Sequence, residues 1–595
     1  MKSTRVSKSS ALHLVPIAGA GVLLTLPVLI FGVPFFSDDG VTHAMWYSHF
    51  SEQFWQGDLY PRWLMNMNSG LGSPVFFYYP PLPFFLTSFL RPFFASDPQG
   101  WHQIGVSCSI AIVASGFAAY LWLKDTTDHF SAMAAAVLYV AMPYHLGDVY
   151  LRGSLSEAWA FVWMPLIIFF TDRIVKGRRL AFLGLASSYA LLIMTHLPTT
   201  LIFSLVPVTY ALFTADEKTR IKATAITLSS LLIGAGLSAI YLLPALLTQQ
   251  YVSIDRMTAG YFSYQNWFLF SKWSPWKDDK LTLLLLAVDM MAIGGCAFFI
   301  SRHRLQDRPK MISRFWFAAA GVSVFMMTEL SQPIWAISSL SKIQFPWRFN
   351  VMLAISVTGL LALAISSLRG ARFTFGRILQ VTALILIMTW IPAMTFAAWK
   401  MFPQTSPDPV VSEAKKTQIQ QTRDAPEYRP RWNQSIREMN WEASVDIDNW
   451  DAKLENEFDS LFERVTPAGG NGPNVKIVQG SGRATVTLRR PRKIDLHIET
   501  STGLTLEAPH FFYPHWTARM LNESDRLSVG PSTPDGLIMF SVPPGSHDVQ
   551  LRLERSSVEL AGEILSLCSV AMALTLALYI GYFKPKSEGR LHARD

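Results

Sequence analysis

The 595-residue chain has little cysteine and little charge. Its three cysteines, Cys108, Cys296 and Cys568, each lie in an apolar run, which favours small core residues over a disulfide or zinc framework. Charged residues make up 16% of the chain, against about 25% in soluble domains. The sequence also lacks a P-loop, a dinucleotide-binding glycine motif, a nucleophile elbow and a His-x-x-x-His metal motif. These absences exclude an ordinary cytosolic enzyme.

Apolar and aromatic residues are abundant. Half of the chain is apolar, with 40 Phe and 19 Trp. Twelve stretches reach the length of about 17 to 25 residues that a helix needs to cross a bilayer. We interpret the first as an anchor, because no small-residue cleavage site precedes Ser37. The pattern predicts a polytopic α-helical membrane protein with about 12 spans, near residues 11–35, 103–123, 129–146, 155–174, 179–196, 198–213, 223–247, 281–300, 313–329, 347–367, 375–398 and 558–583.

The basic residues are distributed as a topology signal. The net charge is +8, which would suggest a nucleic-acid partner if it were clustered on one soluble face. Instead, 23 of the 51 Lys and Arg residues lie on the side of the membrane that holds both termini, against 9 in the short loops opposite. The positive-inside rule therefore makes both termini cytoplasmic. We expect no nucleic-acid partner.

Residues 75–94 form a further apolar stretch, which contains several prolines. If this stretch crossed the membrane, the later basic loops would lie on the side away from the basic N-terminus. Proline also removes backbone donors that lipid cannot replace. We therefore expect a broken re-entrant or interfacial segment that returns to the outer face and helps to wall the active site.

A soluble stretch near the C-terminus has a different pattern. Residues 401–450 are polar and rich in Pro, Gln and Asn, as in a linker. After a glycine-rich turn at residues 469–472, seven short runs alternate between apolar and polar residues, which is typical of a small β-sandwich. We predict a transmembrane domain over residues 1–400, an extracytoplasmic linker and β-sandwich over 401–556, and an anchor with a cytoplasmic tail over 557–595. The sandwich either binds glycan or serves as a spacer.

Two adjacent acids follow the first predicted span. Asp38 and Asp39 precede a helical, aromatic-rich segment. His43 lies four residues after Asp39, so the side chains of Asp39 and His43 can face one cavity. Paired carboxylates at the mouth of a span suit a general base whose pKa is raised by partial burial and a like charge. The alternative interpretation is that one of them only caps the helix.

Other ionisable groups lie on the same predicted side, where they are functional hypotheses by default. Arg152 and Glu157 flank the start of a span, although Glu157 also suits a helix N-terminus. His196 lies between two spans. A histidine at such a position more often only forms hydrogen bonds at a helix end. Arg348 lies among aromatic residues that include Trp347. It either binds a lipid-linked phosphate or is an anchor whose charged end extends to the membrane surface. Asp289 lies deep in an apolar run and must face protein or a polar cavity.

These residues fall within a recognisable series of motifs. The acidic pair, the segment Gly57-Asp-Leu-Tyr-Pro-Arg-Trp63 and the segment Tyr79-Pro-Pro-Leu82 resemble the first extracytoplasmic loop of GT-C glycosyltransferases. The chain is also similar to the bacterial multipass family labelled pyruvoyl-tetrahydropterin-synthase-related membrane protein. That similarity covers nearly the whole chain. It rests on Arg152, Gly153 and Glu157, on His196 and Pro198, on Gln344 to Phe349, and on Glu427, Tyr428 and Pro430. The C-terminal motifs Tyr513-Pro-His-Trp516 and Pro543-Pro-Gly-Ser-His-Asp-Val549 resemble the β-sandwich at the end of related transferases, although His515 stands where those usually have Gly.

The resemblance implies a GT-C-like fold and an inverting glycosyl transfer in the bacterial cytoplasmic (inner) membrane. A polyprenyl-phosphate sugar would be the donor, and a glycan or lipid on the extracytoplasmic side the acceptor. Asp39, with Asp38 beside it, would deprotonate the acceptor, and basic residues would stabilise the leaving phosphate. The implied substrate and lipid-phosphate site comprises Arg348, Arg152, His43, Glu157, His196, Tyr79 and Trp347. Some GT-C enzymes bind a divalent cation near the loop acids, so a cation site stays open as an alternative.

Two other functions fit the same sequence. A lipid-linked glycan flippase would have polar residues spread through the midplane and inverted repeats, but only Asp289 lies deep and we find no repeat. A non-catalytic envelope assembly protein is the third possibility. A transferase accounts best for acids gathered in an outer loop.

Overall fold

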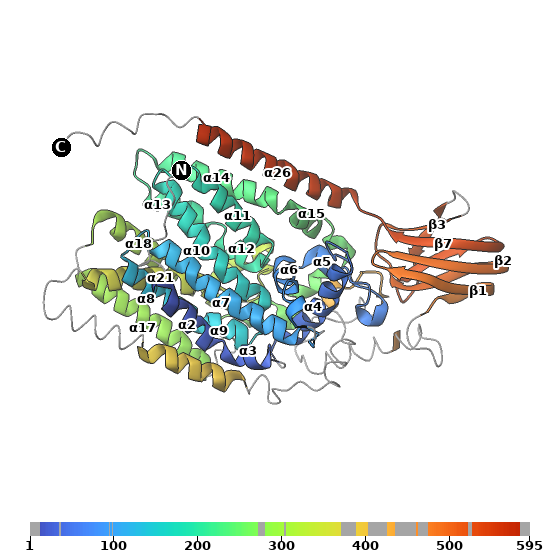
Figure 1. Ribbon diagram of the computed structural model, residues 1–595, viewed down its shortest axis with the longest axis horizontal. Coiled ribbons are helices and arrows are strands. Elements are labelled where there is room, and N and C mark those ends of the chain that lie inside the picture. Colours follow the sequence, from blue (N-terminus) through green and yellow to red (C-terminus); the bar gives the residue numbers. More distant parts are fainter. Residues whose placement is uncertain are drawn as a thin grey trace.

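The computed structural model describes residues 12–34, 37–94, 96–97, 99–269, 271, 280–302, 305–369, 388–402, 425–434, 460–461, 474–521 and 526–582. A bundle of apolar helices forms most of the molecule, and an antiparallel sheet lies at one end of it (Figure 1). The helices that build the bundle and its loops are α2 (Leu14–Leu24), α3 (Leu26–Phe31), α4 (Gly40–Trp55), α5 (Val75–Tyr78), α6 (Leu82–Ser88), α7 (Trp101–Leu123), α8 (His129–Val140), α9 (Pro143–Tyr150), α10 (Leu155–Val175), α11 (Ala181–Ile193), α12 (Leu197–Phe203), α13 (Val206–Thr214), α14 (Arg220–Leu237), α15 (Ala239–Leu247), α17 (Lys280–Arg302), α18 (Asp307–Met326), α19 (Gln332–Trp335), α20 (Ser338–Ser341), α21 (Asn350–Arg369) and α26 (Ser557–Tyr582).

Seven helical stretches in the described part of the chain are long and apolar enough to cross a membrane, or eight if the bent pair α18 and residues 329–335 is one span. The predicted twelve spans are therefore not confirmed. The first stretch breaks at Thr25 into α2 and α3, and α11 has only 13 residues. Residues 375–398 lie partly outside the described residues. Local breaks, which hydropathy does not register, account for the shorter helices.

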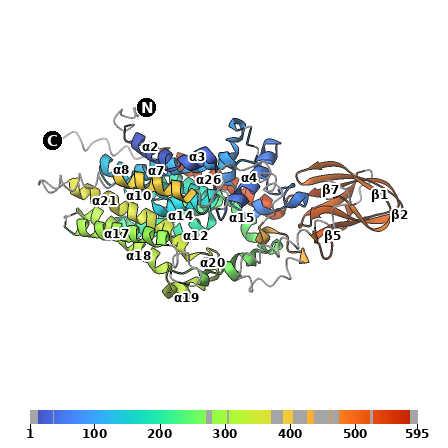
Figure 2. The ribbon, with the colours of Figure 1, turned by 90° about the horizontal axis from the view of Figure 1, so that it is seen from below.

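Close helix packing depends on small residues. A Cβ added at Gly105 of α7 would lie 2.2 Å from the carbonyl oxygen of Val28, so the glycine lets α3 approach α7 closely. The last helix, α26, runs from the sheet along α14 and α15, while α17 and α18 pack near α21 (Figures 1 and 2). Cys568 is exposed on α26, so the expectation that all three cysteines are core residues is wrong for Cys568; Cys108 and Cys296 are buried.

Residues 75–94 form a broken segment, as predicted. The short helices α5 and α6 are separated by Tyr79 in an extended conformation, and a 3₁₀ turn covers Arg91–Phe93. Prolines precede both helices, and each helix starts where the proline's fixed φ allows it. The segment packs against α4 through Phe50, Phe76 and Phe84, and so lies beside the acidic loop rather than forming a span.

The sheet contains seven strands in one hydrogen-bonded arrangement with the order β4-β3-β7-β2-β6-β5, and β1 pairs with β2. Strand β2 pairs with β7 over residues 493–500 and with β6 over residues 504–511, with Gly503 at φ +85° between these halves. Only residue 528 separates β4 from β5 at the two ends of this order, so the sheet curls into a barrel-like form. The strands are β1 (Lys476–Arg490), β2 (Lys493–Phe511), β3 (Trp516–Met520), β4 (Arg526–Leu527), β5 (Val529–Pro531), β6 (Leu537–Val542) and β7 (Gly545–Leu553).

A sandwich of two separate sheets, which the sequence predicted, is therefore not the arrangement of the described strands. The predicted runs at residues 493–500 and 504–508 join into the single strand β2, because its backbone bends at Gly503 without breaking. Alternate side chains of β2, such as Leu496 and Ile498, are buried inside the curled sheet.

The sheet is fixed to the helical bundle by buried polar contacts. The Arg62 guanidinium donates to Glu559 of α26 over 2.6 Å, and Arg492 donates to the same carboxylate over 2.9 Å. The Phe511 amide of β2 donates to the Leu71 carbonyl over 2.8 Å. Trp63 packs against Trp516 with ring centroids 5.8 Å apart. The sheet and the first loop therefore form one packed unit.

Candidate active site

The acidic loop after α3 is hydrogen-bonded through its backbone to the turn between α9 and α10. The Asp39 amide donates to the Arg152 carbonyl over 2.7 Å, and the Asp38 amide donates to the Leu151 carbonyl over 3.3 Å. Gly153 has φ +62°, and a Cβ there would lie 2.3 Å from Ser37 Oγ and 2.9 Å from Gly40 Cα. This close approach requires glycine, and it sets the positions of both acids relative to Arg152.

Asp39 occupies the N-cap position of α4, but its side chain makes no capping hydrogen bond. Its carboxylate instead accepts a hydrogen bond from Arg152 Nη2 over 3.3 Å, and its side chain is 38% exposed. The capping interpretation therefore fails for Asp39, whose carboxylate is both paired and accessible. Asp38 reaches the surface, yet partial loss of hydration and the neighbouring charge of Asp39 raise its pKa to about 6.

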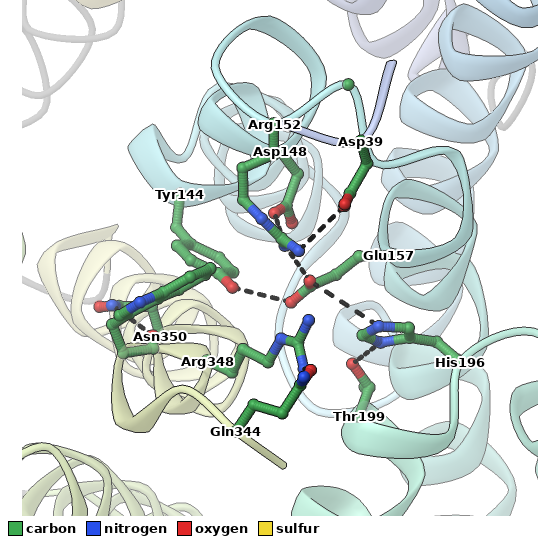
Figure 3. A network of polar contacts seen from close by, with 12 residues as sticks. Asp39, Tyr144, Asp148, Arg152, Glu157, His196, Thr199, Gln344, Arg348 and Asn350 are labelled. Atoms are coloured by element: carbon green, nitrogen blue, oxygen red, sulfur yellow. Dashed lines mark hydrogen bonds and ion pairs between the residues drawn. The ribbon is translucent and has the colours of Figure 1, made fainter. Parts of the chain in front are cut away.

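Arg152 is the centre of a buried ion-pair network (Figure 3). Its Nη1 donates to Asp148 Oδ1 over 2.8 Å and also to Glu157 Oε2, while Nη2 faces Asp39. Burial alone would lower the pKa of the guanidinium, but the carboxylates of Glu157, Asp148 and Asp39 raise it well above its usual range. The Arg152 guanidinium also lies 4.8 Å from the centroid of the Trp347 ring. Arg152 is therefore permanently charged and held in place.

Glu157 lies in the first turn of α10 and joins the network to two further groups. Its Oε1 accepts a hydrogen bond from the Tyr144 hydroxyl over 2.8 Å, and its Oε2 lies 4.0 Å from His196 Nε2. Burial lowers the pKa of His196 to about 3, and the charge of Glu157 only partly opposes this shift. His196 is therefore neutral at physiological pH, and its Nδ1 is 2.8 Å from Thr199 Oγ1.

Arg348 brings a second buried cation to this cluster. Its Nη1 donates to the Ile343 carbonyl over 2.7 Å and to Gln344 Oε1 over 3.2 Å. Its Nε is buried and has no hydrogen-bond partner. Figure 3 shows the guanidinium facing the space between Glu157 and His196. A buried cation with an unused donor is suited to bind an anion, because an unpaired buried donor is costly.

His43 and Tyr79 form an adjoining pair. His43 Nε2 lies 2.8 Å from the Tyr79 hydroxyl, and its Nδ1 lies 3.2 Å from the carbonyl oxygen of Gly153. Burial lowers the pKa of His43 and raises that of Tyr79, so both side chains are neutral at physiological pH. The Tyr428 ring packs 6.2 Å from the Tyr79 ring, which brings the motif at residues 427–430 to the same place.

The structure thus gathers most of the predicted site residues. Asp39, Arg152, Glu157 and His196 form one cluster, with Arg348 beside it. His43, Tyr79 and Trp347 line this cluster, while Asp38 stays at its surface. Asp289 is buried within α17, as expected.

Sequence reasoning missed Asp148 and Tyr144, which both bind members of the network. The spacing of four residues between Asp148 and Arg152 was a usable signal, because such pairs are neighbours on a helix. Tyr144 lies 13 residues before Glu157 and gave no such signal.

The carboxylates do not fit a metal site. Asp39, Asp148 and Glu157 all direct oxygens at the Arg152 guanidinium, which occupies the position between them that a cation would take. Within the described ranges, no group of three or more His, Cys, Asp or Glu side chains is arranged to hold a metal ion.

The solved structures that are similar to this chain at low identity include the following three. The arabinofuranosyltransferase AftD from Mycobacteria is 16% identical with a TM-score of 0.43, over 65% of this chain and 27% of that chain. ArnT from Cupriavidus metallidurans, bound to undecaprenyl phosphate, is 14% identical with a TM-score of 0.42, over 82% of this chain and 98% of that chain. The Archaeoglobus fulgidus oligosaccharyltransferase, in complex with Zn and sulfate, is 14% identical with a TM-score of 0.33, over 75% of this chain and 57% of that chain. The chain thus spans about a quarter of AftD.

No curated protein matches the sequence. A family model described as "6-pyruvoyl-tetrahydropterin synthase related domain; membrane protein" matches residues 76–402, which is more than half of the chain. This range contains Arg152, Glu157, His196 and Arg348. The chain therefore belongs to the 6-pyruvoyl-tetrahydropterin-synthase-related family of membrane proteins.

Proposed function

We propose that the chain is an inverting membrane glycosyltransferase of the GT-C type. It moves a sugar from a polyprenyl-phosphate-linked donor to a glycan or lipid acceptor on the extracytoplasmic side. The observation that carries this proposal is the Asp39 carboxylate, which is accessible, makes no capping hydrogen bond and is held by Arg152. Arg348, with its unused Nε, belongs to the same group of residues. A base and an anion site within one cluster are the two groups that such a transfer needs.

Asp39 acts as the base. Its carboxylate accepts the proton of an acceptor hydroxyl, and the acceptor oxygen bonds to the anomeric carbon of the sugar. The bond between that carbon and the phosphate oxygen breaks at the same time, and its electron pair leaves with the lipid phosphate. Attack from the face opposite the phosphate inverts the anomeric centre. Arg152 positions the Asp39 carboxylate through the 3.3 Å hydrogen bond.

Arg348 is the better candidate for the phosphate than Arg152. Arg152 is already paired with three carboxylates, so an additional anion there would meet their repulsion. Arg348 retains a buried Nε without a partner and lies at the start of residues 346–368, a helical stretch long and apolar enough to span a membrane. We therefore assign the lipid-linked phosphate to Arg348, whose charge would stabilise the leaving group.

The ends of the bundle support the extracytoplasmic placement. Arg173, Lys176 and Arg308 lie together around Asp172 and Asp125, at the helix ends opposite the candidate site. By the positive-inside rule, that basic end faces the cytoplasm. The candidate site and the sheet then face outwards, in the bacterial inner membrane that we expect for this family.

The test is glycan profiling of cells that carry Asp39→Asn beside a deletion strain and the matched variant Asp38→Asn. Asn keeps the size of Asp but cannot accept the proton, so transfer by Asp39→Asn should fall roughly 100-fold or more while the protein still folds and inserts. Arg348→Ala should weaken use of the lipid-phosphate donor. An unchanged glycan in both Asp variants, against a changed glycan in the deletion strain, would remove the loop acids from the mechanism. Transport or assembly would then be the better account.

A further inference from the structure

A cavity of about 500 Å³ lies at the junction between the helical bundle and the sheet, apart from the ion-pair network. Three segments line it: Gln250 and Tyr251 after α15, residues 431–434, and residues 531–533 at the end of β5. Its volume is in the range of about 300 to 1,000 Å³ that is usual for small-molecule sites.

Backbone hydrogen bonds hold these segments together. The Arg431 amide donates to the Tyr251 carbonyl over 3.2 Å, and the Gln434 amide donates to the Pro534 carbonyl over 3.0 Å. The Arg431 guanidinium donates to the Gln250 carbonyl over 3.0 Å. The cavity is therefore preformed, and a ligand would not have to order its walls.

The lining combines aromatic faces with amide side chains. The rings of Tyr251 and Trp432 lie 6.3 Å apart at 32°, and Phe512 meets Trp432 almost at a right angle, with centroids 5.0 Å apart. Gln250 and Gln434 are exposed at the cavity, so their amide groups offer both donors and acceptors. The described lining residues include one cation, Arg431, and no carboxylate.

This combination suits a sugar. The C–H face of a pyranose or furanose ring carries partial positive charge and packs on the negative face of an aromatic ring. The ring hydroxyls both donate and accept hydrogen bonds, as the two glutamine amides can. Because Arg431 is the only charged lining residue that the structure describes, neutral and anionic sugars fit and cationic sugars do not.

One chain segment connects the cavity to the candidate active site. Tyr428, four residues before Trp432, packs 5.6 Å from Trp46 and 6.2 Å from Tyr79, and Tyr79 contacts His43. Four residues span at most about 14 Å even when fully extended. The cavity therefore lies close to Tyr79 and His43, which line the candidate active site.

We propose that this cavity is a subsite for the acceptor, which binds a neutral or anionic oligosaccharide through the Trp432 and Tyr251 rings and the Gln250 and Gln434 amides. The identification of the ligand as the acceptor rests on the proposed glycosyltransferase function, whereas oligosaccharide binding at this place does not. The acceptor would then be a glycan chain held at the junction of the sheet and the bundle, not a small lipid acceptor held only within the membrane.

The test measures binding of soluble oligosaccharides to the purified full-length protein in detergent, by calorimetry and by quenching of tryptophan fluorescence. The panel contains neutral hexose oligomers, N-acetylated oligomers and uronate-containing oligomers. At least one should bind, and Trp432→Ala should weaken that binding about 10-fold. Trp432→Phe should stay within about threefold of the wild-type protein, because it retains an aromatic face.

Gln434→Ala changes an exposed side chain, so it tests the site without a risk to folding, and it should also weaken binding. Gln56→Ala, at an exposed glutamine outside the cavity, is the matched control and should bind as the wild type does. Asp39→Asn should lose transfer but keep most of the oligosaccharide binding, because Asp39 does not line the cavity, and this pattern separates the subsite from the catalytic proposal. The inference is overturned if no oligosaccharide in the panel binds, or if binding survives both Trp432→Ala and Gln434→Ala.

Discussion

Replacing Arg152 by methionine should destabilise the protein strongly. Asp148 and Glu157 are fully buried, and both direct oxygens at the Arg152 guanidinium. Breaking a buried ion pair by removing one partner costs about 3 to 5 kcal/mol, because the remaining charge is left uncompensated in a medium of low polarity. Unfolding entropy of about 2 cal/mol/K per residue makes each kcal/mol worth about 1 °C in a chain of this length. We expect Arg152→Met to lower the Tm by about 3 °C or more.

The assay is thermal unfolding of the purified protein in detergent between pH 4 and pH 8. The deficit of Arg152→Met should shrink as the pH falls, because protonated carboxyl groups no longer need a cation. Adding Asp148→Asn to Arg152→Met should recover part of the loss, since one of the two buried carboxyl groups is then removed. The Tm of Arg152→Lys should lie between those of the wild type and Arg152→Met, because lysine keeps the charge but lacks the planar guanidinium group. A Tm of Arg152→Met within about 1 °C of the wild type at neutral pH would contradict the claim that Arg152 stabilises the fold through its contacts with Asp148 and Glu157.

Three further predictions concern other parts of the molecule. The folded-state pKa of Asp38, about 6, lies above its ordinary 3.8, so the wild type loses stability as the pH rises between these values. Above pH 6, the free energy of unfolding of Asp38→Asn should therefore exceed that of the wild type, by at most about 1 kcal/mol because solvent screens the charge. At pH 4, the two proteins should be equally stable. Glu559→Gln should weaken the contact between the sheet and the bundle, because it leaves the buried Arg62 without its carboxylate; limited proteolysis should cut this variant faster than Glu563→Gln, whose ion pair is exposed. Single cysteines placed in residues 586–595, which lie outside the described residues, and in β6 should be labelled from opposite sides of the membrane, and labelling from one side contradicts the topology.

Much of the secondary structure could be predicted from local patterns. The prolines near residues 75–94 predicted the break between α5 and α6, because proline removes a backbone donor wherever it stands. The period-two runs predicted strands, because alternation reports which side chains face a core. The division into two sheets was wrong, since a bend at Gly503 that keeps the strand intact has the same local sequence signal as a turn.

The sequence indicated which charged residues near helix ends belong to the candidate site. It did not indicate which of them contact each other, because the partners are distant in sequence. Asp39, Arg152 and Arg348 stood out because ionisable groups near a membrane are costly. That Asp39 forms an ion pair and makes no cap could not be foreseen, because its partner lies 113 residues away and is brought close by packing around Gly153. The cavity beside Trp432 draws on three distant segments, and none of them carries a motif on its own.

The backbone contact between residues 37–40 and 151–153 has a consequence for how this site can change. Two main-chain hydrogen bonds and a glycine set where the Asp39 carboxylate and Arg152 meet, so the frame does not depend on either side chain. A change of the Asp39 side chain therefore leaves the spacing between the two segments intact. A residue with a Cβ at position 153 would instead separate the two segments. The geometry of the site therefore depends on Gly153, which has no side chain to take part in any chemistry.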